Sequence, residues 1–422
     1  MSSVGSLVKK YKAKNHIRFL TAASLFDGHD AAINIMRRIL QSTGVEVIHL
    51  GHNRSVEDVV NAAIQEDVHA IAISSYQGGH VEYFKFILDL LKEKGASHIK
   101  VFGGGGGVIV PDEIAELHAY GVSYIFSPED GQTMQLQGII NRMVEMADYD
   151  LTSINTMLNE PSSIPQGHLG LARFITALDE GIVSDTDIEQ ISTQADRFGQ
   201  TPVLGITGTG GAGKSSLTDE LIRRFQLDLN ELTIAVIAID PTKRKTGGAL
   251  LGDRIRMNAI NHPNIYFRSI ATRNTVGEVP ESLSHIINAC KVAEFDLIIV
   301  ETPGIGQGDA GIVPFVNTSM YVMTAEFGAA SQLEKIDMLD FADLVVINKF
   351  DRKGSDDAYR DVRKQYQRNY ELFDTSLDEL PIYGTIASKF NDDGVTALYQ
   401  GLLETFSNKQ LNTWQGNFFE LA

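Results

Sequence analysis

Residues 202–216 read PVLGITGTGGAGKSS, a run of strand-forming residues followed by a glycine-rich loop, a lysine and two serines. Glycines let successive backbone N–H groups converge on phosphate oxygens, and a helix beginning near Lys214 adds positive potential at its N-terminus. A simple glycine-rich turn capped by Ser215 is the alternative. The strand before the loop and the helix after it are the setting that a phosphate-binding loop requires. The sequence therefore predicts a P-loop nucleotide-binding domain.

The side chains of this loop have distinct expected roles. Lys214 is placed to neutralise the charge of the β- and γ-phosphates, and the Ser215 hydroxyl is placed to bind Mg²⁺. The full set of expected phosphate-binding residues is Gly208, Gly211, Gly213, Lys214, Ser215 and Ser216.

Recognition of the base is predicted at Asn348-Lys349-Phe350-Asp351, directly after the apolar run 344–347. The carboxylate of Asp351 can accept hydrogen bonds from N1 and N2 of guanine, which adenine cannot offer. Alone, this tetrapeptide also fits a plain turn, but its position after a phosphate loop favours GTP and GDP. Ser388, after the predicted strand 382–385, is expected in a loop that supports the base.

Three acidic residues of the predicted P-loop domain follow predicted strands or a glycine. Asp240 ends the run 233–239, Glu301 ends the run 297–300, and Asp253 follows Gly252. Acids at strand ends beside a phosphate loop can bind Mg²⁺ directly or through water, although each could instead cap a helix. We expect Lys214 and these acids to support catalysis of hydrolysis. Glu301-Thr-Pro-Gly304 has the form of a second switch, in which Gly304 can turn its N–H toward a γ-phosphate. The position just after Gly304 is not a glutamine, so slow intrinsic hydrolysis is expected.

The first part of the chain alternates short β-rich runs with amphipathic segments. Strands are predicted at 17–23, 46–50, 70–74, 99–102 and 123–126, with helices at 31–41, 56–64 and 81–91. This order predicts a doubly wound, flavodoxin-like parallel sheet, whose ligands bind at the carboxyl ends of the strands. Asp27 and His29 follow the first strand directly. A carboxylate there can fix the tautomer of an imidazole, although an isolated histidine is more often a cap or a surface residue.

The sequence also suggests how the chain is divided. The predicted parts are a first domain at 1–147, a helical linker at 148–200, a P-loop domain at 201–406 and a tail at 407–422. The overall class is α/β in both domains. The apolar tail, with Trp414, is expected to dock on a further domain.

Composition excludes several classes of partner. The formal net charge of −18 repels phosphate backbones and anionic lipids, which argues against nucleic acid or membrane as the main partner. Cys290 is the only cysteine, so an internal disulfide is impossible and a reducing, cytoplasmic location is expected. The apolar runs are too short to span a bilayer.

Residues 202–406 resemble the G-protein chaperones of adenosylcobalamin-dependent acyl-CoA mutases. The resemblance is carried by Asp240-Pro241, by Thr246-Gly-Gly-Ala-Leu-Leu-Gly-Asp253 and by Glu301-Thr302. It implies Mg²⁺-linked roles for Asp240, Asp253 and Glu301. It also implies that residues 331–337 form an additional switch loop that signals to a mutase.

The first domain resembles the cobalamin-binding domain of base-off, histidine-on enzymes, with the pattern Asp-x-His-x-x-Gly. Asp27, His29 and Ala32 occupy these positions, so alanine replaces the final glycine. The resemblance implies that His29 binds cobalt and that Ser74 lines the slot for the displaced base. The family's Gly-Gly falls within 103–107, where Gly106 and Gly107 are the expected contacts.

Together the two domains resemble the N-terminal part of fused isobutyryl-CoA mutases. This implies adenosylcobalamin, GTP or GDP, and Mg²⁺ as cofactors, with GTP gating cofactor loading and release. Radical isomerisation of isobutyryl-CoA and n-butyryl-CoA is expected only with an acyl-CoA-binding mutase barrel, present in trans or as a further C-terminal region. An adenosyltransferase and a second copy of the chain are further expected partners.

Three alternatives remain open from the sequence. The chain could be a corrinoid-responsive regulator with a GTPase signalling domain, or a component of a methylmalonyl-CoA mutase type of enzyme. A GTPase that delivers a bare metal is the third, but such proteins usually carry His- or Cys-rich clusters, and none is evident in the sequence.

Overall fold

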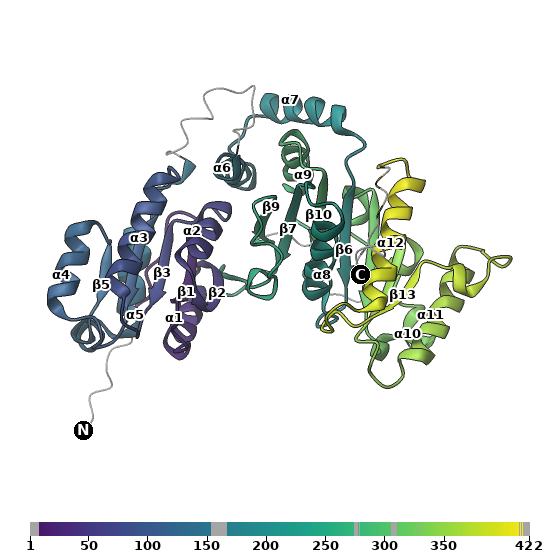
Figure 1. Ribbon diagram of the computed structural model, residues 1–422. Helices are drawn as coiled ribbons and strands as arrows, with labels where there is room; N and C mark the ends of the chain where they lie inside the picture. Colours follow the sequence, from purple (N-terminus) through teal and green to yellow (C-terminus); the bar gives the residue numbers. More distant parts are fainter. Residues whose placement is uncertain are drawn as a thin grey trace. The chain divides into compact units, whose positions relative to one another are not determined.

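The computed structural model describes residues 8–152, 167–273, 277, 279–304, 310–328, 330–412, 414 and 416 (Figure 1). The chain forms two compact units. The first contains residues 1–180 and 241–255, and the second contains residues 181–240 and 256–422. Each unit is built on one parallel sheet, as the βα alternation predicts.

The sheet of the first unit has the order β5-β4-β3-β1-β2-β8. Alternate residues of its strands, including Phe19, Val47 and Phe102, share a core with α1 and α5, which therefore cover one face. The strands are β1 (Arg18–Ser24), β2 (Glu46–Arg54), β3 (Ala70–Ser74), β4 (Lys100–Gly104), β5 (Tyr124–Phe126) and β8 (Ala249–Leu251). The helices are α1 (Ala31–Ser42), α2 (Val56–Gln65), α3 (His80–Glu93), α4 (Pro111–Tyr120), α5 (Pro128–Ala147) and α6 (Gly167–Asp179).

The sheet of the second unit has the order β13-β12-β11-β6-β10-β7-β9. The strands are β6 (Val203–Gly208), β7 (Ile234–Asp240), β9 (Ile265–Ala271), β10 (Leu297–Glu301), β11 (Thr318–Met323), β12 (Leu344–Asn348) and β13 (Ile382–Thr385). The helices are α7 (Asp185–Ala195), α8 (Lys214–Asp228), α9 (Leu283–Val292), α10 (Ala330–Leu333), α11 (Ser355–Asn369) and α12 (Asp393–Asn408).

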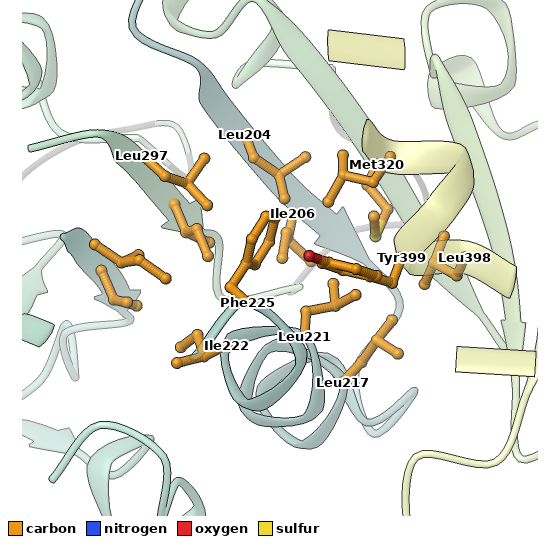
Figure 2. Packing of buried hydrophobic residues seen from close by; sticks show 14 of the residues in the cluster. Leu204, Ile206, Leu217, Leu221, Ile222, Phe225, Leu297, Met320, Leu398 and Tyr399 are labelled. Atoms are coloured by element: carbon orange, nitrogen blue, oxygen red, sulfur yellow. The ribbon is translucent and has the colours of Figure 1, made fainter. Parts of the chain in front are cut away.

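The core of the second unit holds the phosphate loop in place. Leu204 and Ile206 of the central strand β6 meet Leu217, Leu221 and Phe225 of α8, as Figure 2 shows. All five side chains are buried. Because burial of each such side chain contributes about 1.5–3 kcal/mol, the strand and the helix on either side of the loop are rigidly joined.

The structure differs from the predicted division of the chain in three places. The predicted linker is shared, since α6 belongs to the first unit and α7 to the second. Residues 241–255, predicted within the P-loop domain, belong to the first unit and supply β8. Trp414, predicted to dock elsewhere, packs edge-on against Phe225 and Phe406 of its own unit, with ring centroids 6.0 and 6.1 Å apart. No described helix combines the length and the apolar character that a bilayer span requires.

Candidate functional site

The phosphate loop has the conformation expected from its glycines. Gly208, Gly211 and Gly213 have φ angles of +145°, +75° and +90°, a region that side chains disfavour. A Cβ on Gly208 would lie 1.9 Å from the carbonyl oxygen of Val322, and one on Gly213 would lie 2.6 Å from the Asn348 amide nitrogen. The loop therefore presses its backbone against neighbouring strands, and no larger residue fits at these two positions.

Lys214 begins α8 and is buried, with only 7% of its surface exposed. Its Nζ donates hydrogen bonds to the carbonyl oxygens of Gly208 and Thr209, at 3.2 and 3.3 Å. These contacts fold the lysine back over the loop. A Cβ on Gly304, from the predicted switch, would lie 2.2 Å from Nζ. The ammonium group and the switch glycine are therefore neighbours, as a γ-phosphate sensor requires.

Glu301 and Ser215 meet at the start of α8. The Ser215 hydroxyl donates to Oε1 of Glu301 at 2.7 Å, and the Thr218 hydroxyl donates to Oε2 at 3.0 Å. Glu301 is buried at the end of β10, the strand beside β6. A hydroxyl and a carboxylate oxygen in contact beside a phosphate loop are oxygen donors that suit a hard cation such as Mg²⁺.

The other two predicted acids, Asp240 and Asp253, belong to different units of the chain. Asp240 is half-buried at the end of β7, two residues beyond Ala238, which pairs with Glu301. Asp253 belongs to the first unit. Within the described parts of the chain, no group of three or more His, Cys, Asp and Glu side chains could hold a metal. Magnesium sites of this class are completed by phosphate oxygens and water, so the Ser215 and Glu301 pair fits such a site.

The loop predicted to bind guanine is anchored by Asn348. Its amide nitrogen donates to the carbonyl oxygen of Ala212 at 2.8 Å, while its Oδ1 accepts from the Thr385 hydroxyl and the Ala387 backbone at 3.0 and 3.1 Å. Lys349, at φ +58°, donates from Nζ to the carbonyl oxygen of Gly211 at 2.7 Å. One asparagine thus ties the phosphate loop to both loops that were predicted to hold the base.

Asp351 and Ser388 are exposed, in loops that follow β12 and β13. These strands pair in register, with Asn348 opposite Thr385, so both loops begin at the same edge of the sheet. Asp392 fixes the second loop, because its Oδ2 accepts hydrogen bonds from the backbone N–H groups of Ile386 and Val395, both at 3.0 Å. An exposed carboxylate beside a fixed loop suits recognition of a base.

In the first unit, the histidine loop holds the predicted pair in contact. Oδ1 of Asp27 accepts hydrogen bonds from Nδ1 and the backbone N–H of His29, both at 2.8 Å. Oδ2 of Asp27 accepts from the backbone N–H of Tyr76 at 2.7 Å. The Asp27 side chain is completely buried, whereas the His29 side chain is 67% exposed. With Nδ1 engaged, Nε2 of the imidazole is the nitrogen left to bind a metal ion.

The surroundings keep Asp27 charged. Burial is the largest single effect and would raise the pKa of Asp27, but hydrogen bonds from the backbones of Tyr76 and His29 and from the His29 ring outweigh it, so the pKa is lowered. A carboxylate that stays ionised strengthens the basicity of the imidazole to which it is bound.

A cavity of about 150 Å³ opens at the carboxyl ends of β3 and β4. Its lining is mostly apolar, from Ala32, Ile33, Met36, Ala72, Ile73, Ser74, Tyr76, Phe102, Gly103–Gly106, Phe126, Ser127, Pro128, Ile139 and Met143. The Ser74 hydroxyl is buried and has no hydrogen-bond partner among the residues that the structure describes, which is costly unless a ligand supplies one. An apolar cavity of this size accommodates an aromatic ring, so the residues present fit the flat base of a cobalamin tail.

The glycines at 103–107 serve different purposes. A Cβ on Gly105 would lie 1.9 Å from the carbonyl oxygen of Ser75, whereas Gly107 has open space around it. Gly106, at φ +59°, lines the cavity, and Gly107 does not. Gly106 thus stays a predicted ligand contact and lies on the cavity wall, whereas Gly107 lies outside the lining.

Several residues of these sites were not predicted. Thr218 contacts Glu301 and Tyr76 contacts Asp27 across long stretches of sequence, whereas Asp392 fixes the base loop through Ile386, six residues before it. Only Asp392 carried a usable signal, because an aspartate before a helix is a common N-cap.

Comparison with known families assigns a family to each part of the chain. Residues 171–412 match the family model described as methylmalonyl-CoA mutase-associated GTPase MeaB. The chain belongs to the MeaB GTPase family. Residues 17–136 match the model of the B12 binding domain. The chain thus joins a cobalamin-binding domain to a MeaB-type GTPase domain, whose ligand is a guanine nucleotide.

Curated relatives share both parts. Fused isobutyryl-CoA mutase of Cupriavidus metallidurans is 66% identical over 390 residues, which is 92% of this chain and 36% of the relative. The enzymes of the same name from Geobacillus kaustophilus and Nocardia farcinica are 58% and 57% identical, over 98% and 95% of this chain. The chain spans little more than a third of the length of these relatives.

Proposed function

We propose that this chain is the cofactor-binding and GTP-dependent control part of an adenosylcobalamin-dependent isobutyryl-CoA mutase. The observation that carries the proposal is the buried carboxylate of Asp27 on Nδ1 of the exposed His29. This arrangement orients a neutral imidazole toward a metal, while Ser74 and Gly106 line an apolar cavity for the displaced base. When bound, adenosylcobalamin would supply the carbon-centred radical that initiates rearrangement of the acyl-CoA in the complete enzyme.

The second unit supplies the control. Lys214 and the N–H groups of the phosphate loop bind the phosphates, Asp351 reads guanine, and Ser215 with Glu301 holds Mg²⁺. Asp240 is proposed to complete the magnesium site through water, and the role of Asp253 stays a prediction from the sequence. Nucleotide state then determines whether cofactor enters or leaves the first unit.

The proposed partners follow from the proposed isomerisation reaction. Isomerisation of isobutyryl-CoA to n-butyryl-CoA needs an acyl-CoA-binding barrel, which the names of the relatives support as a mutase partner. We further propose an adenosyltransferase as the source of cofactor, assembly as a homodimer, and a cytoplasmic location.

Absorption spectroscopy tests the cobalamin site directly. The chain mixed with adenosylcobalamin is expected to give the spectrum of histidine-ligated, base-off cofactor, and His29→Ala is expected to abolish it. Identical spectra for the two proteins would remove His29 as the axial ligand. The same titration with GDP or with a non-hydrolysable GTP analogue measures control, since the affinity for cobalamin should differ between the two nucleotides.

A further inference from the structure

Residues 241–255, here called the strap, leave the second unit after β7 and return to it at Arg256. Between these points the strap adds β8 to the sheet of the first unit. The pairing with β2 is parallel, with Glu46 opposite Ala249 and Ile48 opposite Leu251. Ala249 and Leu251 are fully buried. A strand of the nucleotide-binding domain's sequence therefore completes the edge of the cobalamin-binding domain's sheet.

The turn before β8 fits closely against the first unit. A Cβ on Gly248 would lie 2.1 Å from the carbonyl oxygen of Gln41 and 2.9 Å from that of Val45. The Ala249 N–H donates to the carbonyl oxygen of Val45 at 3.3 Å. Only glycine permits this approach, because both obstructing atoms belong to the backbone.

Beyond β8, Arg254 enters a buried charge network. Its Nε lies 3.2 Å from Oε1 of Glu66, and its second terminal nitrogen donates to Gln65 at 2.7 Å. The other oxygen of Glu66 pairs with Arg18 at 2.9 Å, and Arg18 also pairs with Glu46 of β2. Glu66 is completely buried. Removing one partner of such a carboxylate leaves a buried charge poorly compensated.

The residues that flank the strap on both sides belong to the second unit. Its first residue, Pro241, follows Asp240, which lies two residues beyond the partner of Glu301 in the ladder. Soon after its last residue, Met257 and Ile260 are buried in the core around α8. Only peptide bonds separate the strap from these anchors. The backbone therefore joins the strap at both ends to residues of the nucleotide-binding unit.

We propose that the strap is the physical coupling between nucleotide state and cobalamin occupancy. The proposal rests on the proposed function, because it names the part of the chain through which that control acts. In this proposal the strap has two states, with β8 and Arg254 either docked on the first unit or released from it. The nucleotide and cobalamin each shift the equilibrium between these states. The contrasting role is a static cover for the edge of β2, which protects an exposed strand without linking the sites.

The test measures coupling in the full chain. Coupling is the ratio of the dissociation constants for adenosylcobalamin in the presence of GDP and of a non-hydrolysable GTP analogue, each with Mg²⁺. Gly248→Ala and Arg254→Gln should bring this ratio from at least about fivefold to within twofold of one. Nucleotide affinity should stay within about threefold. Gly252→Ala is the matched control, because its Cβ would meet only Leu250 Cγ, at 3.8 Å.

Hydrogen exchange of the peptide covering 246–252 shows whether the strap has been loosened, independently of cofactor binding. Exchange should be faster in both test variants and unchanged in the control. Wild-type coupling close to one would defeat the proposed function itself. Intact coupling in variants whose strap exchanges faster would overturn the proposal for the strap alone. Hydrogen exchange that is unchanged in Arg254→Gln would also overturn it.

Discussion

Nδ1 of His29 lies 2.8 Å from Oδ1 of Asp27, a carboxylate that is wholly buried beneath an exposed imidazole. The carboxylate is itself held by the backbone of Tyr76, at the end of a different strand. The ring is therefore oriented before any ligand arrives. Such pre-organisation lowers the entropy cost of binding a metal.

Asp27→Asn should weaken cobalamin binding roughly 10- to 100-fold, because an amide neither fixes the imidazole tautomer nor raises its basicity. Titration followed by absorption spectroscopy measures the change. Asp30→Asn is the matched control, since Asp30 is exposed and its side chain does not cap α1. Equal affinities for the wild type and Asp27→Asn would show that the contact has no role in ligation.

Ser74→Ala should separate binding from stability. Its hydroxyl has no partner in the described parts of the chain, so its loss should leave the free energy of unfolding unchanged or slightly higher. Affinity for cobalamin should fall about tenfold, the value of one hydrogen bond to the ligand.

Ser24→Ala provides the contrast for this experiment. The Ser24 hydroxyl donates to Ser75 at 2.8 Å, and its loss should cost about 1 kcal/mol in urea denaturation. If Ser74→Ala bound cobalamin like the wild type, the hydroxyl would have no contact with the ligand.

Asp351→Asn should reduce GTP affinity by about 100-fold or more, because an amide cannot accept from both N1 and N2 of guanine. Xanthine carries an acceptor where guanine carries its amino group, so the variant should bind xanthosine triphosphate better than the wild type does. Fluorescent nucleotide competition measures both. Asp356→Asn is the matched control, because Asp356 is exposed in the first turn of α11, and it should bind nucleotides like the wild type. Unchanged preference for GTP in Asp351→Asn would place base recognition elsewhere.

The first unit should lose stability in mild acid. Burial lowers the pKa of His69 to about 4, and its Nδ1 accepts a hydrogen bond from the Arg18 backbone at 3.1 Å, which requires the neutral ring. In the unfolded chain this group titrates near 6.5, so the unfolded state binds more protons below that pH. The contribution of neutral His69 to the free energy of unfolding is therefore fully present above pH 6.5 and decreases as the pH falls toward 4. At pH 5 the loss from His69 is roughly 2 kcal/mol.

Urea denaturation at pH 7.5 and pH 5.0 checks this expectation, with His69→Asn as the comparison. The asparagine oxygen can still accept a hydrogen bond but does not titrate. A wild type and a variant with the same dependence on pH would show that His69 is not responsible.

Much of both domains could be predicted because their signals are local. Strands β1–β5 begin or end within a few residues of the expected runs, since alternation of apolar strands and amphipathic helices is written along the chain. The phosphate loop follows from glycine spacing, and Asn348 with Lys349 from the order of strand and turn. The division of the predicted linker between the two units could not be predicted, because the sequences of α6 and α7 do not show which unit each helix packs against.

Taken alone, the sequence determined the two parallel sheets, the phosphate loop and the position of His29 after the first strand, because backbone conformation and hydrophobic period depend on neighbouring residues. Only the tertiary structure decided that β8 joins the first sheet, that Arg254 meets Glu66, and that the Ser74 hydroxyl finds no partner within the described residues. Pairing of strands and burial of charges depend on which distant segments meet. That choice is made by the free energy of the whole fold and leaves no local pattern.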